Sequence, residues 1–289
     1  MDSTIDVTLQ RAVALHGQGA AAQAALLYGE ILRTHPNHAD ALHLLGVAET
    51  QLGRAQQGMD LIEMSLKINP QQPVAIANLG NALLALDRPL EALARYDRAL
   101  VMWPDYTLAL FGRGNALSAL DQPAEALACF DRVLRLVPDF AEALNSRGAV
   151  LLKLKRREEA IASFDRALEI SPTLAQAHSG RGNALSELGH TDAAIHAYER
   201  ALQLDPNLSS ALLSRGIALS MRARFTEAAA SFRRLTEIDP ECAYAPGACL
   251  HAQLQQCDWT DYDRAVTRLF ECLSQRGVDG SFIGVWATL

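Results

Sequence analysis

The sequence predicts an all-α protein built from repeated antiparallel helix pairs, with capping helices at its C-terminal end. Three observations carry this prediction. Alanine and leucine dominate the composition, and both lose little free energy on entering a helix. A proline recurs every 34 residues, at Pro36, Pro70, Pro104, Pro138, Pro172, Pro206 and Pro240. Ten residues after each of the first six prolines stands a glycine, here called the repeat glycine: Gly46, Gly80, Gly114, Gly148, Gly182 and Gly216.

The first helix of each predicted unit is centred on the repeat glycine. Leucine or isoleucine usually stands four residues before it and leucine three residues after it, as in Leu110, Gly114 and Leu117. These offsets share one helical face, so the glycine lies within a buried apolar stripe. Because glycine has no side chain, a second helix can approach closely. This offsets the ~1 kcal/mol that a glycine costs inside a helix.

The second helix of each unit is expected to pack back onto that glycine. Alanine usually stands 22 residues after the proline, and four residues later come Ile62, Tyr96, Phe130, Phe164, Tyr198 and Phe232. Residues four apart lie on one helical face, so the alanine and the large side chain form the contact surface. The next proline ends the second helix and begins the turn into the following unit.

This pattern of Leu/Ile-x2-x-Gly-x2-Leu, Ala-x3-Phe/Tyr and a closing proline resembles the tetratricopeptide repeat. Seven units fit the frame, at residues 5–38, 39–72, 73–106, 107–140, 141–174, 175–208 and 209–242. The resemblance implies a right-handed superhelical solenoid over residues 1–242, with each unit packed on the next around a concave groove. Residues 243–289 are expected to form a helical cap. A non-repeating helical bundle is the alternative.

Helix geometry predicts which residues line the groove. At about 100° per residue, the positions two before, one after and five after the repeat glycine point away from the buried stripe. The two glycines Gly112 and Gly180 are expected to open this inner face. Asparagine can both donate to and accept from a peptide backbone, which suits an extended peptide. Solvated small residues without a ligand are the alternative. The predicted peptide-groove residues are Asn78, Asn81, Asn115, Ser146, Asn183 and Ser214.

An arginine precedes the repeat glycine in four units, at Arg113, Arg147, Arg181 and Arg215. In a structural interpretation, the stems cover apolar surface and the guanidinium groups meet acids or carbonyls between repeats. In a functional interpretation, the arginines bind acidic or phosphorylated ligands. The second helices also carry acid–arginine pairs within YDRAL, FDRVL, FDRAL and YERAL, which are expected on a solvated outer face.

The repeat frame breaks after Pro240, and the segment CDWTDYD follows at Cys257–Asp263. It resembles the junction between repeats and catalytic region in O-linked N-acetylglucosamine transferases, including SPINDLY-like members. The resemblance implies that Cys257, Asp258 and Trp259 are junction residues without a catalytic role. The catalytic part of that family binds a nucleotide sugar between two Rossmann-like lobes. Only about 30 residues follow Trp259, so we expect no catalytic residue, no cofactor and no enzymatic activity.

Charge and composition disfavour several other classes. A net charge of −7 argues against nucleic-acid binding, and no apolar run is long enough to span a membrane. The acidic N-terminus lacks the order of a secretory signal, and the five cysteines do not form a disulfide framework, so a cytoplasmic location is expected. The spacing of Cys242, Cys249, His251 and Cys257 fits no compact zinc motif, so no metal is expected.

The sequence therefore predicts a non-catalytic scaffold or adaptor that binds an extended peptide or a partner protein segment in the concave groove. Two alternatives stay open. The chain could be the substrate-targeting half of a truncated or split O-linked N-acetylglucosamine transferase-like protein. It could also be a structural repeat protein that associates with itself through the convex face or an open terminal repeat.

Overall fold

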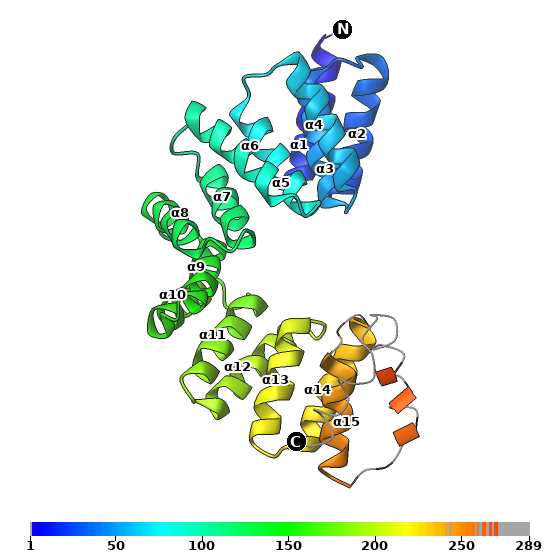
Figure 1. Cartoon of the computed structure of the whole chain (residues 1–289). Helices are drawn as coiled ribbons and strands as arrows, with labels where there is room; N and C mark the ends of the chain where they lie inside the picture. Colours follow the sequence, from blue (N-terminus) through cyan, green and yellow to red (C-terminus); the bar gives the residue numbers. More distant parts are fainter. Residues whose placement is uncertain are drawn as a thin grey trace. The chain divides into compact units, whose positions relative to one another are not determined.

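The computed structural model describes residues 2–240, 242, 244–257, 259, 262–263, 266–267 and 269–270. These residues form 15 α-helices and no strand (Figure 1). The chain divides into two compact units, Met1–Val150 and Leu151–Leu289, and each has an apolar core of its own. Within the described part of the chain, every helix is too short or too polar to cross a bilayer.

Both units consist of helix pairs in chain order. The first contains α1 (Asp2–Gly17), α2 (Ala21–Thr34), α3 (Ala39–Gln51), α4 (Ala55–Ile68), α5 (Pro73–Ala85), α6 (Pro89–Met102), α7 (Thr107–Ala119), α8 (Pro123–Leu136) and most of α9 (Ala141–Lys153). The second contains the end of α9 and α10 (Arg157–Ile170), α11 (Ala175–Glu187), α12 (Thr191–Leu204), α13 (Ser209–Met221), α14 (Phe225–Ile238) and α15 (Tyr244–Leu254). Six first helices begin at residues 39, 73, 107, 141, 175 and 209, where the second to seventh predicted repeats begin.

A tight turn separates the two helices of each repeat. Seven positions after the repeat glycine, the backbone takes a positive φ at Gly53, Asp87, Asp121, Lys155, Gly189 and Ala223. The next amide then donates back into the first helix, as Arg156 N does to Leu151 O at 2.9 Å. Glycine adopts this left-handed backbone freely, whereas another residue there costs roughly 1–2 kcal/mol. This turn therefore tolerates Lys155 only at a cost in stability.

The ring of the second helix packs on the repeat glycine, which confirms the predicted contact. A Cβ atom placed on Gly114 would lie 2.7 Å from Cε1 of Phe130, and one on Gly182 would lie 2.5 Å from Cε1 of Tyr198. Both distances are too short for non-bonded carbon atoms, so an alanine at either position would displace the ring and cost stability. Each of these buried rings contributes about 2–3 kcal/mol relative to an exposed one.

The expectation that Gly112 and Gly180 open the inner face is wrong. A Cβ atom on Gly112 would lie 2.5 Å from Cε1 of Tyr96, and one on Gly180 would lie 2.5 Å from Cε1 of Phe164. Both rings come from the preceding repeat. Tyr96 is thus held between Gly80 of its own repeat and Gly112 of the next. The helical wheel missed this contact because it considered the neighbours within one repeat only.

The helix α15 packs on α14 and covers the end of the last repeat. Its Ala248 and Ala252 join Phe232 of α14 in the core of the second unit. The small side chains let α15 lie close to the preceding helix. The predicted cap over 243–289 is therefore helical where α15 forms, and most of its remainder lies outside the described residues.

Candidate interaction groove

The groove face consists of the residues two before, one after and five after each repeat glycine, on the first helices of the repeats. The residues five after the glycine are all exposed: Gln51, Ala85, Ala119, Lys153, Glu187 and Met221. Among the predicted groove residues, Asn81 is exposed. The half-buried ones are Asn78, Asn115, Ser146, Asn183 and Ser214. These side chains lie at the surface of the repeats, in reach of a ligand.

In the first unit, four polar side chains form one chain of hydrogen bonds across α3, α5 and α6. Tyr96 Oη donates to Asn81 Oδ1 at 2.6 Å, and Asn81 Nδ2 donates to Asn78 Oδ1 at 3.3 Å. Asn78 Nδ2 in turn donates to His43 Nε2 at 2.9 Å. Two of the predicted groove amides are therefore brought together and held by Tyr96 and His43, neither of which was predicted to belong to the groove.

His43 ends this chain as an acceptor, which places its own proton on Nδ1. The side chain is buried, with an exposed fraction of 8%. Burial lowers the pKa of His43 below its usual value, and the nearby carboxylate of Asp40 opposes this shift more weakly. The neutral imidazole therefore fits the hydrogen bond that Asn78 donates to it.

In the second unit, Asn183 and Ser214 lie in one pocket of about 610 Å³. Tyr198 Oη donates to Asn183 Oδ1 at 2.9 Å, which leaves the amide nitrogen of Asn183 available to a ligand. Burial raises the pKa of Tyr198 to about 12, so its hydroxyl stays protonated at neutral pH. The pocket is lined by Leu152, Lys153, Lys155, Asn183, Ser186, Glu187, Tyr198, Ser214 and Ile217.

In both units, the tyrosine that donates a hydrogen bond to the groove asparagine stands 15 residues after it, in the pairs Asn81–Tyr96 and Asn183–Tyr198. Phe130 occupies the matching position for Asn115 and has no hydroxyl to donate. Among the described residues, neither Asn115 nor Ser146 has a side-chain hydrogen bond. The constant spacing is a signal in the sequence that could have identified the tyrosines as part of the groove.

Each arginine that precedes a repeat glycine meets an acid on the second helix of the preceding repeat. Nε of Arg113 lies 2.7 Å from Asp97 Oδ1, and Nε of Arg147 lies 2.7 Å from Asp131 Oδ1. In the second unit, Nε of Arg181 lies 2.6 Å from Asp165 Oδ1 and Nη2 of Arg215 lies 3.3 Å from Glu199 Oε1. This geometry corresponds to the structural interpretation of the arginines.

The acids of the YDRAL, FDRVL, FDRAL and YERAL segments are these same four partners. These acids are partly exposed, as a solvated face requires, but they also pair with arginines of the next repeat, which the sequence did not predict. Asp97 has a side-chain exposed fraction of 51%, yet it pairs with Arg113 of the next repeat. The partners are 16 residues apart in each case, because one second helix and the following first helix lie side by side. Stacking of the repeats decides this pairing.

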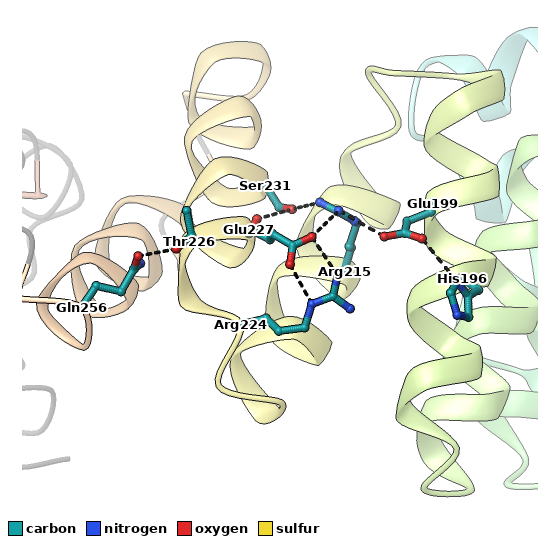
Figure 2. A network of polar contacts seen from close by, with 8 residues as sticks. All are labelled: His196, Glu199, Arg215, Arg224, Thr226, Glu227, Ser231 and Gln256. Atoms are coloured by element: carbon teal, nitrogen blue, oxygen red, sulfur yellow. Dashed lines mark hydrogen bonds and ion pairs between the residues drawn. The ribbon is translucent and has the colours of Figure 1, made fainter.

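Arg215 is the most enclosed of the four arginines and joins three helices of the second unit (Figure 2). Its Nη1 donates to Ser231 Oγ at 2.8 Å, and its Nη2 also lies 3.7 Å from Glu227 Oε2. Arg224 holds the same Glu227 through two hydrogen bonds of 2.7 and 2.8 Å and thereby lowers the pKa of that carboxyl group. This network stabilises α12, α13 and α14 and does not line the pocket.

Two of the predicted junction residues are described. Cys257 is exposed and has a φ of 54°. Trp259 has an exposed fraction of 62% and meets Tyr262 edge to face. Asp258 lies outside the described residues. In the described part of the chain, no cluster of three or more metal-ligating side chains is found.

A helical repeat protein with a polar and aliphatic groove is the class that this fold and site define. Family models described as tetratricopeptide repeat match residues 15–83, 78–120, 111–175 and 175–208. Together they span residues 15–208, which is 194 of the 289 residues. The chain therefore belongs to the tetratricopeptide repeat proteins, which bind peptides or protein partners.

Solved structures share the fold. The chain resembles a protein in the APC/C hetero-tetramer Cut9–Hcn1 with a TM-score of 0.73 and 17% identity, over 93% of this chain and 52% of that one. A tetratricopeptide repeat protein from Parabacteroides merdae ATCC 43184 gives a TM-score of 0.67 and 16% identity, over 86% of this chain and 98% of that one. A thermophilic TPR protein from Thermus thermophilus gives a TM-score of 0.55 and 26% identity, over 63% of this chain and 99% of that one.

A comparison with curated proteins gives no match. The family models cover the repeats and add no support for the likeness to the O-linked N-acetylglucosamine transferases. That likeness, and with it the junction role of Cys257, Asp258 and Trp259, stays a prediction.

Proposed function

We propose that this chain is a non-catalytic interaction scaffold that holds an extended peptide, or an extended segment of a partner protein, on its groove face. The single observation that carries the proposal is the pocket of about 610 Å³ in the second unit. It lies across residues from three successive first helices, the end of α9, α11 and α13. A ligand there would contact several repeats at once.

The pocket walls provide hydrogen-bonding groups for a peptide backbone and aliphatic surface for a small apolar side chain. Asn183 presents a free amide nitrogen to a carbonyl, and the hydroxyls of Ser186 and Ser214 can donate or accept. Leu152 and Ile217 supply aliphatic surface, on which an apolar side chain would lose its contact with water. Tyr198 holds Asn183 in one orientation, so less conformational entropy is lost on binding.

The experiment selects ligands and then tests where they bind. Random linear peptides displayed in a library are selected on the immobilised full chain, and the affinity of an enriched peptide is measured by isothermal titration calorimetry. Replacing Ile217 by Gln should weaken that affinity about fivefold, because aliphatic contact is lost. Ile68→Gln is the matched control, since Ile68 is exposed to 46% and Ile217 to 39% but only Ile217 lines the pocket.

Two results would contradict the proposal: a library without any enriched peptide, or an enriched peptide whose affinity Ile217→Gln leaves unchanged. The two other hypotheses, a targeting half of a split glycosyltransferase and a self-assembling repeat protein, gain no specific observation from the described residues. The expectation that the chain has no enzymatic activity likewise stays a prediction.

A further inference from the structure

Positive charge is concentrated at one side of the pocket in the second unit. The whole chain has a net charge of −7 and contains only three lysines, Lys67, Lys153 and Lys155. Two of the three line this pocket. The matching positions five after the repeat glycine in the first unit are Gln51, Ala85 and Ala119, none of which is charged. The cationic wall is thus a local feature of the second unit.

Lys155 occupies a backbone position that disfavours lysine. Its φ is 61°, in the left-handed region, at the turn where two other repeats place Gly53 and Gly189. Side chains with a Cβ atom are strained in this conformation. Asp87, Asp121 and Ala223 take the same conformation at this turn in other repeats, so the strain belongs to the turn and does not by itself mark Lys155. The lysine therefore weakens the turn and at the same time places an ammonium group at the pocket.

The one acid that lines the pocket, Glu187, is already held by another residue. Arg157 Nε donates to Glu187 Oε2 at 2.8 Å, whereas Lys155 Nζ lies 3.6 Å from the same oxygen. The longer distance exceeds an ordinary N–H···O hydrogen bond. The Lys155 side chain is also exposed to 66%, so its attraction to Glu187 is weakened by solvent. Lys155 can therefore turn to another carboxylate without leaving Glu187 unpaired.

We propose that the ligand of this pocket is an acidic peptide segment, with a glutamate or aspartate side chain that pairs with Lys155 beside the amide of Asn183. This inference rests on the proposed function and specifies its ligand. The peptide backbone binds Asn183 and the serines, a small apolar side chain covers Ile217, and the carboxylate reaches Lys155. Nucleic acid is disfavoured as the ligand, because its many phosphates need a broad basic surface that a chain of net charge −7 does not offer.

The test uses the same selection of random displayed peptides on the full chain. We expect the enriched pool to contain more Asp and Glu than the input library. Replacing the acidic residue of an enriched peptide by its amide should weaken binding about threefold or more at low salt, and raised salt should shrink this difference. In the Lys155→Gly chain, the acidic peptide should lose affinity to a similar degree, while its amide version should bind as before.

Lys155→Gly also separates binding from folding. Glycine relieves the strained turn, so this variant should unfold at the same or a higher temperature than the wild type. Ala223→Gly is the matched control, because Ala223 has a φ of 56° at the same turn position of another repeat of the second unit. It should match Lys155→Gly in stability and bind the acidic peptide like the wild type. Lys67→Gln, which removes the same charge outside the groove face, should also bind like the wild type.

An enriched pool without an excess of acidic residues would overturn this inference and leave the groove proposal standing. So would an acidic peptide whose affinity is the same for the wild type and Lys155→Gly. A selection that enriches no peptide at all would overturn the proposed function itself, together with the ligand inferred for it.

Discussion

In the first unit the groove face around α5 is occupied by its own side chains, whereas in the second unit the groove face around α11 leaves a pocket. His43 and Asn78 hydrogen-bond to each other between two successive first helices of the first unit. Ser179 and Ser214 stand at the same repeat positions in the second unit. Because serine is much shorter than histidine or asparagine, space remains beside Ser214 for a ligand. One side chain from each of two successive repeats thus distinguishes the filled surface of the first unit from the surface with a pocket in the second.

The largest expected effect comes from adding a side chain to the repeat glycines on which Tyr198 and Tyr96 pack. Gly182→Ala should destabilise the protein by about 2 kcal/mol, because its Cβ atom would lie 2.5 Å from the ring of Tyr198. Gly80→Ala in the first unit should cost less, since the nearest atom of Tyr96 lies 2.8 Å away. Urea unfolding followed by circular dichroism measures both free energies of unfolding.

Gly29→Ala is the control for these two substitutions. No atom would lie within 4 Å of a Cβ atom on Gly29, which is in helix α2. Alanine there should stabilise the helix by about 0.5–1 kcal/mol. If Gly182→Ala were as stable as the wild type, Tyr198 would not be confined as described. The two groove faces could then no longer be compared as two sites at which a confined tyrosine holds an asparagine.

A smaller difference is expected between the arginines of the two units. Arg215→Ala should cost about 1–2 kcal/mol, because its side chain is exposed to only 18% and Ser231 and Glu199 lose a partner. Arg113→Ala in the first unit should cost less than about 1 kcal/mol, since Arg113 is exposed to 31% and Asp97 to 51%. Urea unfolding again provides the measurement.

The control for the arginines is Arg200→Ala, which removes a hydrogen bond from an exposed arginine to Gln203 within one helix and should change stability little. Equal losses for Arg215→Ala and Arg113→Ala would show that burial does not distinguish the two sites. A loss of stability in Arg200→Ala as large as that in Arg215→Ala would show that the pairs between repeats contribute no more than a contact within one helix.

Much of the fold could be predicted because its contacts recur at fixed spacings along the chain. The repeat glycine and the ring on the second helix are near neighbours in sequence, so one repeat suffices to predict that Gly182 meets Tyr198. Contacts between repeats need the stacking geometry as well. The 16-residue spacing of Arg113 and Asp97 was visible, yet its meaning depends on which helices lie side by side.

The candidate site could be predicted only in part. Position on the helix placed Asn183 and Ser214 on the groove face, and the structure brings them together in one pocket. The contributions of Tyr198 and Lys155 could not be predicted in the same way. Its spacing from Ala194 placed Tyr198 in the contact with the repeat glycine, and its ring is buried there, but the spacing did not reveal that its hydroxyl reaches the groove. Lys155 lies in a turn, where the helical wheel gives no direction.

The smallest expected effect is a pH dependence confined to the first unit. Burial lowers the pKa of His43 in the folded protein, so between that lowered pKa and the usual value near 6.5 the unfolded chain binds more protons than the folded one. The free energy of unfolding should therefore fall as the pH decreases through this window. Protonation would also make Nε2 a donor and break the hydrogen bond from Asn78 Nδ2.

Replacing His43 by Gln keeps an acceptor for Asn78 and removes the titrating group, so the variant should lose less stability than the wild type between pH 7 and 5. Urea unfolding at several pH values measures this slope. His196→Gln is the control, because His196 is exposed to 80% and pairs with Glu199 at 3.4 Å in the second unit. If the free energy of unfolding changed with pH equally in His43→Gln and the wild type, His43 would not titrate as its burial requires. The filled groove face of the first unit would then be no more sensitive to acid than the open groove face of the second.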